Sequence, residues 1–131
     1  MILLDTHVLV TLALRPERLS KQAARAISRA EARDGVAIAS ITLWELAQLI
    51  QAGRLKVPGS TESFLRALCQ RQGLTVLDLT PEIAALTVQF PPDFPKDPGD
   101  RIIAATARAH GLRLVTKDQA MLDSPLVETI A

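Results

Sequence analysis

Short apolar runs of strand type alternate with longer helical stretches along the chain, and this alternation limits the folds open to it. The runs cover residues 1–4, 36–39, 74–79 and 113–116, with a weaker one at 126–129. Each is shorter than an ordinary helix and is bounded by polar or turn-forming residues. Strands that alternate with helices predict βαβ units. We therefore expect an α/β fold with a mostly parallel central sheet and helices on both faces.

The stretches between the runs carry helix signals. Residues 20–33 place alanines and an isoleucine on one face, with Arg25, Arg29 and Arg33 largely opposite. Pro81 follows a threonine cap and precedes an acid, which is typical of a helix start. Reading the other segments in the same way, we predict helices over residues 7–14, 20–33, 42–51, 60–71, 82–88, 99–110 and 119–122, and a proline-rich loop over 90–96.

Length and composition set the broad class. The chain has 131 residues, of which 48% are hydrophobic and 22% charged, so we expect one well-buried domain spanning residues 1–131. Its one cysteine, Cys69, cannot form an internal disulfide, which suits a reducing, cytoplasmic setting. The N-terminus lacks the charged start of a signal peptide, and no apolar stretch approaches ~20 residues, so we expect no membrane partner.

Four acidic residues stand at the edges of apolar segments and are the main functional signal. Asp5 and Asp118 follow predicted strands, while Glu45 and Asp100 fall in the first turns of predicted helices. Such positions converge at one edge of an open α/β sheet. Carboxylates that meet without a cation repel one another, whereas with Mg²⁺ or Mn²⁺ they form a hard, oxygen-rich metal site. This pattern points to metal-assisted phosphodiester chemistry.

The net charge of the chain does not exclude a nucleic-acid substrate. The formal charge is only +1, but because the four acids contribute −4, the rest of the chain carries +5. A surface of that charge can hold a phosphate backbone weakly. Aromatic residues make up 3% of the chain and tyrosine is absent, which argues against base stacking as the main binding mode.

Each acid also has a purely structural interpretation. Asp5 can be a plain N-cap of the helix that follows it, and Asp118 can cap the short helix over residues 119–122. Thr42 and Glu45 have the spacing of a capping box, in which the glutamate reaches back to the threonine amide. We favour metal roles for these acids because the positions agree with one another.

Asp97 and Asp100 compete for one role at the start of the same helix. Asp97 stands before Pro98, as expected of an N-cap with proline at the first helical position. We therefore assign Asp97 to the cap and Asp100 to metal. Arg101 is expected to support these acids through an ion pair or to contact phosphate, with structural support favoured.

Two threonines complete the set of supporting residues. Thr6 is expected to hold a ligand in place or cap the first helix, and Thr116 to present a hydroxyl near the attacking water. We expect His7 and His110 to be surface or packing residues, with no histidine spacing that would suit zinc. Trp44 is expected to pack, and Cys69, in the middle of a predicted helix, to lie in the core.

Taken together, five motifs resemble the PIN-domain family, specifically the VapC-type toxins of toxin–antitoxin pairs. The order and spacing of the motifs carry the resemblance, since each alone is weak. They are Leu4-Asp5-Thr6-His7-Val8-Leu9-Val10, Ser40-Ile41-Thr42-Leu43-Trp44-Glu45, Gly53-Arg54-Leu55, Asp97-Pro98-Gly99-Asp100-Arg101-Ile102-Ile103-Ala104-Ala105 and Val115-Thr116-Lys117-Asp118. Three departures alter the rim of the site and leave the acids intact: Thr11, Pro95 and Gly99, where many relatives carry tryptophan, histidine and a bulky residue.

The resemblance implies a PIN-like α/β/α sandwich that cleaves RNA with Mg²⁺ or Mn²⁺. The family's metal-binding acids fall on Asp5, Glu45, Asp100 and Asp118. It also implies a homodimer whose active-site groove is blocked by a small cognate antitoxin. The alternative is a catalytically silent PIN-like module that binds RNA or serves assembly, although a binder gains nothing from four acids that repel phosphate.

Other phosphate chemistries of α/β folds fit the residues less well. A haloacid-dehalogenase-like phosphatase needs a second aspartate two residues after the first, and His7 occupies that place. A dinucleotide binder needs a glycine-rich turn after the first strand, where this chain has Asp5, Thr6 and His7. Water activated by the metal and oriented by Glu45 or Asp118 is the expected nucleophile, leaving a 3′-hydroxyl and a 5′-phosphate.

Overall fold

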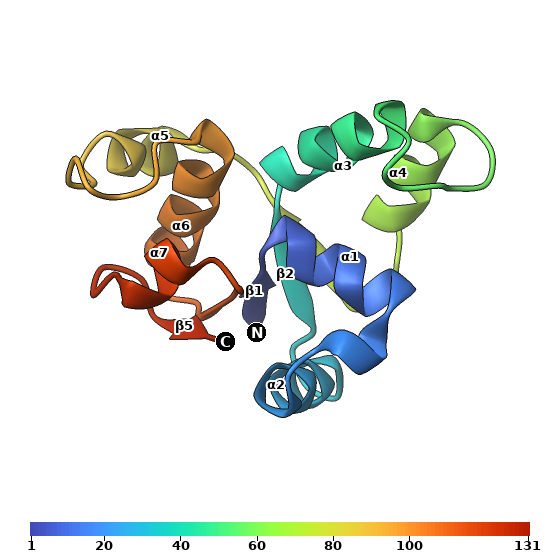
Figure 1. Cartoon of the computed structure of the whole chain (residues 1–131), viewed down its shortest axis with the longest axis horizontal. Helices are drawn as coiled ribbons and strands as arrows, with labels where there is room; N and C mark the ends of the chain where they lie inside the picture. The colour runs from blue at the N-terminus through green and yellow to red at the C-terminus, as the bar shows by residue number, and fades with distance from the viewer.

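A computed structural model describes all residues from 1 to 131, and its centre is a five-stranded sheet (Figure 1). The strands are β1 (Ile2–Leu4), β2 (Val36–Ala39), β3 (Leu74–Leu77), β4 (Leu114–Val115) and β5 (Thr129–Ile130). Their order in the sheet is β3-β2-β1-β4-β5. Every neighbouring pair is parallel, so the sheet is wholly and not just mostly parallel.

Helices cover both faces of the sheet, as predicted. They are α1 (Thr6–Leu14), α2 (Lys21–Glu31), α3 (Ile41–Gln51), α4 (Thr61–Cys69), α5 (Pro81–Thr87), α6 (Pro98–His110) and α7 (Gln119–Asp123), with a short 3-10 turn η1 (Pro16–Arg18). In Figure 1, α5, α6 and α7 lie on one side of β1 and β2, and α1, α3 and α4 lie on the other. This is the α/β/α sandwich that the alternation of elements predicts.

The strands alternate their side chains between two apolar cores. Ile2 and Leu4 join the core under α1 and α2, while Leu3, between them, joins the core under α6. Adjacent strands follow the same rule, since side chains along a strand point to opposite faces. Strands buried on both faces need continuous apolar sequence, which explains the short unbroken runs.

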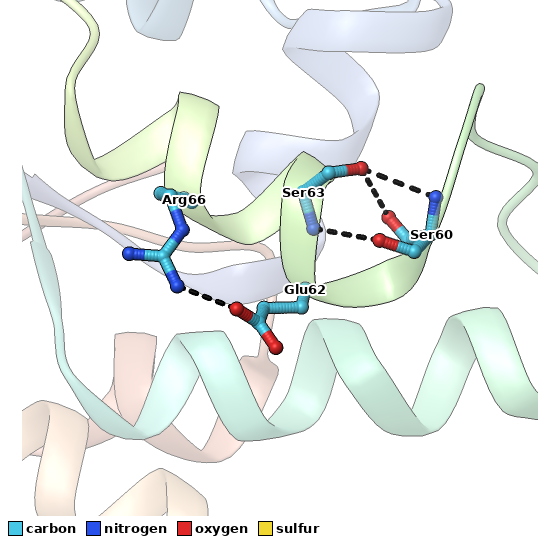
Figure 2. Close-up of polar contacts among 4 residues, drawn as sticks. All are labelled: Ser60, Glu62, Ser63 and Arg66. Atoms are coloured by element: carbon cyan, nitrogen blue, oxygen red, sulfur yellow. Dashed lines mark hydrogen bonds and ion pairs between the residues drawn. The ribbon is translucent and has the colours of Figure 1, made fainter.

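Local signals in the sequence explain most helix ends. The Ser20 hydroxyl accepts a hydrogen bond from the Ala23 amide at the start of α2, and Gly111 closes α6 with a left-handed φ of 64°. At the start of α4, Ser60 and Ser63 form a reciprocal capping box, and one turn along the helix Arg66 pairs with Glu62 (Figure 2).

Most predicted elements differ from the structure by one or two residues at an end, and two of these differences are informative. The helix predicted over residues 60–71 spans Thr61–Cys69, and Ser60 lies outside it as the cap. The strand predicted over residues 126–129 is replaced by the later, two-residue β5, which pairs Thr129 with Leu114 and Ile130 with Val115. The position of β5 is set by its pairing with β4, and the residues around β5 do not indicate that pairing.

No helix of the structure is both long and apolar enough to span a membrane.

Candidate functional site

The parallel strands bring the predicted acids to one edge of the sheet. Asp5 directly follows β1, and Asp118 follows β4 after two residues. β1 and β4 are neighbours, and the chain connects them only after it has built β2 and β3 on the other side of β1. The direction of strand order therefore reverses between them. In open α/β sheets, the carboxyl end of such a switch point is the usual binding crevice.

Asp5 is held rigidly at this point. Its side chain is buried, with Oδ1 accepting from the Thr6 amide at 2.8 Å and Oδ2 accepting from the Thr116 hydroxyl at 2.7 Å. The predicted cap at Asp5 is thus present and does not exclude a second role. Each oxygen of a carboxylate has more than one acceptor site, so both can still receive a further ligand.

Thr116 serves Asp5 and the turn after β4. Its Oγ1 donates to Asp5 and accepts from the Asp118 amide at 3.0 Å, and the residue is fully buried. The hydroxyl proton is already donated to a carboxylate, so a place for this hydroxyl near an attacking water stays a prediction. Thr116 positions Asp5 relative to Asp118.

Glu45 is held by a hydrogen bond from a residue far away in the sequence. The Thr6 hydroxyl donates to Glu45 Oε1 at 2.7 Å and lies 2.9 Å from the Thr42 hydroxyl. Since Thr6 has one hydroxyl proton, Thr42 must donate to Thr6, and the three side chains form a chain that ends on the carboxylate. The alternative capping box of Thr42 and Glu45 is wrong: α3 begins at Ile41, so Thr42 is already inside the helix.

The start of α6 gives Asp97 and Asp100 different surroundings. Asp97 Oδ1 accepts from the amides of Gly99 and Asp100 at 2.8 and 3.4 Å, with Pro98 as the first helical residue. Asp97 is therefore the N-cap. The Asp100 carboxylate makes no hydrogen bond and lies half-buried, on the first turn of the helix.

Gly99 explains how Glu45 approaches this helix. A Cβ on Gly99 would lie 2.8 Å from Glu45 Oε2 and 3.1 Å from Asp97 Oδ1. Either contact would displace a carboxylate oxygen. The small residue, one of the departures from the family pattern, thus makes room for the glutamate.

The carboxylates perturb one another. Burial is the main cause that raises the pKa of Asp5 and of Glu45, against the hydrogen bonds that each accepts. Burial and the charges of Asp97, Asp5, Asp118 and Glu45 raise the pKa of Asp100 to about 7. Such a cluster of acids without an opposing cation is a pattern of functional sites.

The acids interact without forming a closed ligand set. As the side chains stand, no three aspartate, glutamate, histidine or cysteine residues lie close enough to bind one metal ion together. Repulsion between the carboxylates accounts for this spread. The chemistry of the acids fits a divalent cation, since they are hard oxygen ligands and none of the four forms an ion pair, but three of them could share an ion only after side-chain movement.

Arg101 does not pair with the acids. Its guanidinium donates to the backbone oxygens of Thr87 and Phe94, at 3.0 and 3.3 Å, and lies over the Phe94 ring. The expected ion pair with the acids is absent, because the guanidinium faces the end of α5 and the loop before α6, while the alternative phosphate contact stays a prediction. Arg101 gives structural support of another kind, tying that loop to the helix that carries Asp100.

An open cleft of about 850 Å³ lies beside Glu45, the one of the four predicted acids that lines it, and its wall contains residues that we expected at the surface or in packing contacts. Trp44 is 57% exposed and lines the cleft beside Glu45. His7 also lines it, and its charge favours ionisation of Asp5 and Glu45. The sequence held a signal for Trp44, since Gln48 and Gln51 at i+4 and i+7 mark its side of α3 as polar.

Replacing Gly99 by alanine should separate the shape of the site from the stability of the fold. Gly99 lies in a helix with an ordinary φ, so Gly99→Ala should leave the melting temperature unchanged or raise it. The new methyl group would push the Glu45 carboxylate aside and should lower the rate of whatever reaction the site performs. Single-turnover rates and thermal melts of the two proteins measure this, with Gly111→Ala, a glycine of positive φ at the far end of α6, as the reverse control. A variant with unchanged rate would contradict the importance of this contact.

Comparison with known proteins agrees with the architecture and with the motifs. The chain belongs to the PIN domain family, whose model matches residues 2–124. It is 41% identical over 120 residues to Ribonuclease VapC22 of Mycobacterium tuberculosis (strain ATCC 25618 / H37Rv), covering 92% of this chain and 88% of that protein.

Solved structures share the fold at low sequence identity. A structure of VapBC2 from Rickettsia felis bound to a promoter DNA fragment matches with a TM-score of 0.71 and 20% identity, covering 99% of this chain and 98% of that one. DNA-bound VapBC from Salmonella typhimurium matches with a TM-score of 0.70 and 24% identity, again covering 99% and 98%. The PIN-like sandwich predicted from the sequence is confirmed.

Proposed function

We infer that this protein is an endoribonuclease of the VapC type, the toxin of a type II toxin–antitoxin pair. The observation that carries the inference is the set of acids at the switch point of a PIN-domain sheet, in a chain 41% identical to a VapC ribonuclease. A protein that only bound RNA would be weakened by these carboxylates, because they repel phosphate.

We propose that Asp5, Glu45, Asp100 and Asp118 hold Mg²⁺ or Mn²⁺ and carry the catalysis. The raised pKa of Asp100 supports this, since a cation would relieve the repulsion that raises it. When bound, such an ion supplies a water of lowered pKa and positive charge opposite the scissile phosphate. Thr6, Thr116 and Asp97 support the acids through the hydrogen bonds described above.

Within this site, Glu45 is the residue best placed to orient the attacking water. Thr6 fixes Oε1 and leaves Oε2 without a hydrogen bond, beside the open space that Gly99 provides. Its raised pKa makes it a stronger proton acceptor than an ordinary glutamate. Glu45 would take a proton from water as the water oxygen attacks phosphorus, the bond between phosphorus and the 3′-oxygen of the leaving nucleotide would break, and that oxygen would take up a proton from solvent. The products carry a 3′-hydroxyl and a 5′-phosphate.

The proposal includes partners. The fold neighbours are VapBC structures, and we propose that a cognate antitoxin of this protein occupies the cleft beside Trp44 and Glu45. We also propose that the protein forms a homodimer and acts in the cytoplasm, where its RNA substrate is found.

Metal removal is the direct test of the mechanism. Purified protein should cleave a total RNA pool in Mn²⁺ or Mg²⁺, lose cleavage in EDTA, and regain it when metal is added back in excess. Sequencing of the cut ends identifies the RNA and the bond broken. Asp100→Asn protein purified in parallel controls for contaminating nuclease. Cleavage that persists in chelator would refute the metal mechanism, and RNA binding without cleavage in any metal would favour the silent-module alternative.

A further inference from the structure

A row of basic side chains runs along α2 and is not used by the site. Lys21, Arg25 and Arg29 follow one another at intervals of four residues, Arg33 continues the row in the turn after the helix, and Arg113 stands just before β4. We call these five residues the basic stripe. All five are exposed, and they line a hollow of about 660 Å³ between α2 and the starts of β1 and β4. α2 lies at the opposite end of the molecule from α3 in Figure 1.

The charges of the stripe are uncompensated. None of its side chains makes an ion pair, because the ion pairs of the chain are Arg66 with Glu62 and the amino terminus with Asp34. Asp34 is the one acid that lines the hollow, and the amino terminus already occupies it. Like charges four residues apart destabilise a helix. The contrast with α4 is direct, since there an acid at the same spacing neutralises the arginine (Figure 2).

The Lys21 end of the basic stripe lies near the turn that carries Asp118. Lys117, between Thr116 and Asp118, donates from Nζ to the backbone oxygen of Arg18 at 3.1 Å. Arg18 precedes α2 by two residues, and the Ser20 cap of α2 donates to the C-terminal Ala131. Along α2 the stripe extends about 12 Å from Lys21 to Arg29, at 1.5 Å per residue. The start of α2 therefore lies beside the turn that carries Asp118, and the stripe leads away from that turn.

We propose that the basic stripe binds the phosphate backbone of the RNA substrate outside the cleaved segment. The inference rests on the proposed ribonuclease function and adds a second contact to it. Arginine suits this role because its planar guanidinium matches phosphate oxygens. Contacts of this kind hold the RNA without reading its sequence. They also make affinity depend steeply on salt, because each phosphate contact releases a counterion.

The test compares RNA binding by two triple variants with equal loss of charge. Arg25→Gln/Arg29→Gln/Arg33→Gln removes the centre of the stripe, and Lys56→Gln/Arg66→Gln/Arg71→Gln removes three exposed cations near α4. Affinity for a labelled synthetic single-stranded RNA is measured in EDTA by fluorescence anisotropy over a range of salt. The slope of log affinity against log salt should become shallower by about 2 for the stripe variant, at ~0.7 per lost contact. Between about 50 and 200 mM salt, the ratio of wild-type RNA affinity to that of the stripe variant should therefore fall by roughly twentyfold.

Further arms keep the proposal separate from the nuclease activity and from folding. At saturating RNA in Mn²⁺ the stripe variant should cleave as fast as wild type, and Arg25→Lys/Arg29→Lys/Arg33→Lys should restore most of the slope. The melting temperature of the glutamine variant should not fall, since like charges have been removed from α2. The proposal would be overturned if wild type and the stripe variant had equal salt slopes, or if the α4 control changed the slope by the same amount. Either result would overturn it even if wild type cleaves RNA. Unchanged RNA affinity with lost antitoxin binding would assign the stripe to a protein partner and overturn it also.

Discussion

Asp100→Asn should lower single-turnover RNA cleavage at saturating Mn²⁺ by at least ~100-fold, the scale of losing one strong electrostatic stabiliser. The same change should leave the melting temperature in EDTA unchanged or raise it. Asp100 makes no side-chain hydrogen bond, and its charge is opposed by burial and by four neighbouring acids. Removing that charge therefore relieves repulsion in the metal-free protein while it takes away a ligand. Loss of function with gain of stability is common at active sites.

The pH dependence of stability gives this prediction a second measurement. The pKa of Asp100 lies at about 7 in the folded protein and near 3.8 in the unfolded chain, so the folded state holds this proton more tightly. The associated stability is fully present below about pH 4 and is lost as the pH rises through about 7. In EDTA, the melting temperature of Asp100→Asn relative to wild type should therefore increase between about pH 4 and pH 8.

Asp97→Ser is the matched comparison in the same helical turn. Serine caps a helix about as well as aspartate, so this variant should keep the fold and most of the activity. If Asp97→Ser is inactive while Asp100→Ser cleaves RNA normally, the roles of cap and metal ligand are the reverse of those assigned. A large drop in the metal-free stability of Asp100→Asn would mark Asp100 as a structural residue.

The sequence predicted those parts of the site that depend on local signals. Asp5 and Asp118 follow apolar runs, and parallel strands necessarily bring their carboxyl ends to one edge. Asp97 and Pro98 form a cap and first-turn pair that needs no tertiary contact, and the structure contains it as predicted. The fold class was predictable for the same reason, because the alternation of strands and helices can be recognised from local sequence patterns.

Residues whose partners lie far away in the sequence were not predictable. Thr42 and Glu45 have the spacing of a capping box, and what decides against it is the helix start at Ile41 and the hydroxyl of Thr6, 39 residues away. Arg101 lies beside acids in the sequence yet bonds to carbonyl oxygens of the preceding loop. In both cases a tertiary contact selects among local alternatives of similar energy.

Helix faces explain a second kind of error. Cys69 was expected in the core because it is apolar and seemed to lie in the middle of a helix, but α4 ends at Cys69 and the residue is exposed. Glu62 and Arg66, at i−7 and i−3, share its face and form an exposed ion pair there. The polar neighbours of one helix face were thus a better guide to its exposure than the hydrophobicity of the residue itself.

Asp5→Asn should abolish the toxicity of the protein in cells that lack its antitoxin. Wild type expressed alone should arrest growth, and the variant should permit it, because Asp5 is the acid at the switch point between β1 and β4. In vitro cleavage should fall by at least ~100-fold. An asparagine can keep the hydrogen bond from the Thr6 amide and donate to the Thr116 oxygen, at a cost of about 1–3 kcal/mol because the buried Thr116 proton then loses its acceptor.

The variant should therefore fold and accumulate, which immunoblots and thermal melts can verify. Glu17→Gln, the same carboxylate-to-amide change at an exposed position outside the site, should remain toxic, and co-expression of the antitoxin should silence it as it silences wild type. If wild type is harmless without an antitoxin, the inference of a toxin fails while that of a nuclease can still stand on cleavage in vitro. If Asp5→Asn accumulates in folded form and still arrests growth, the acid at the switch point is not part of the machinery that kills the cell.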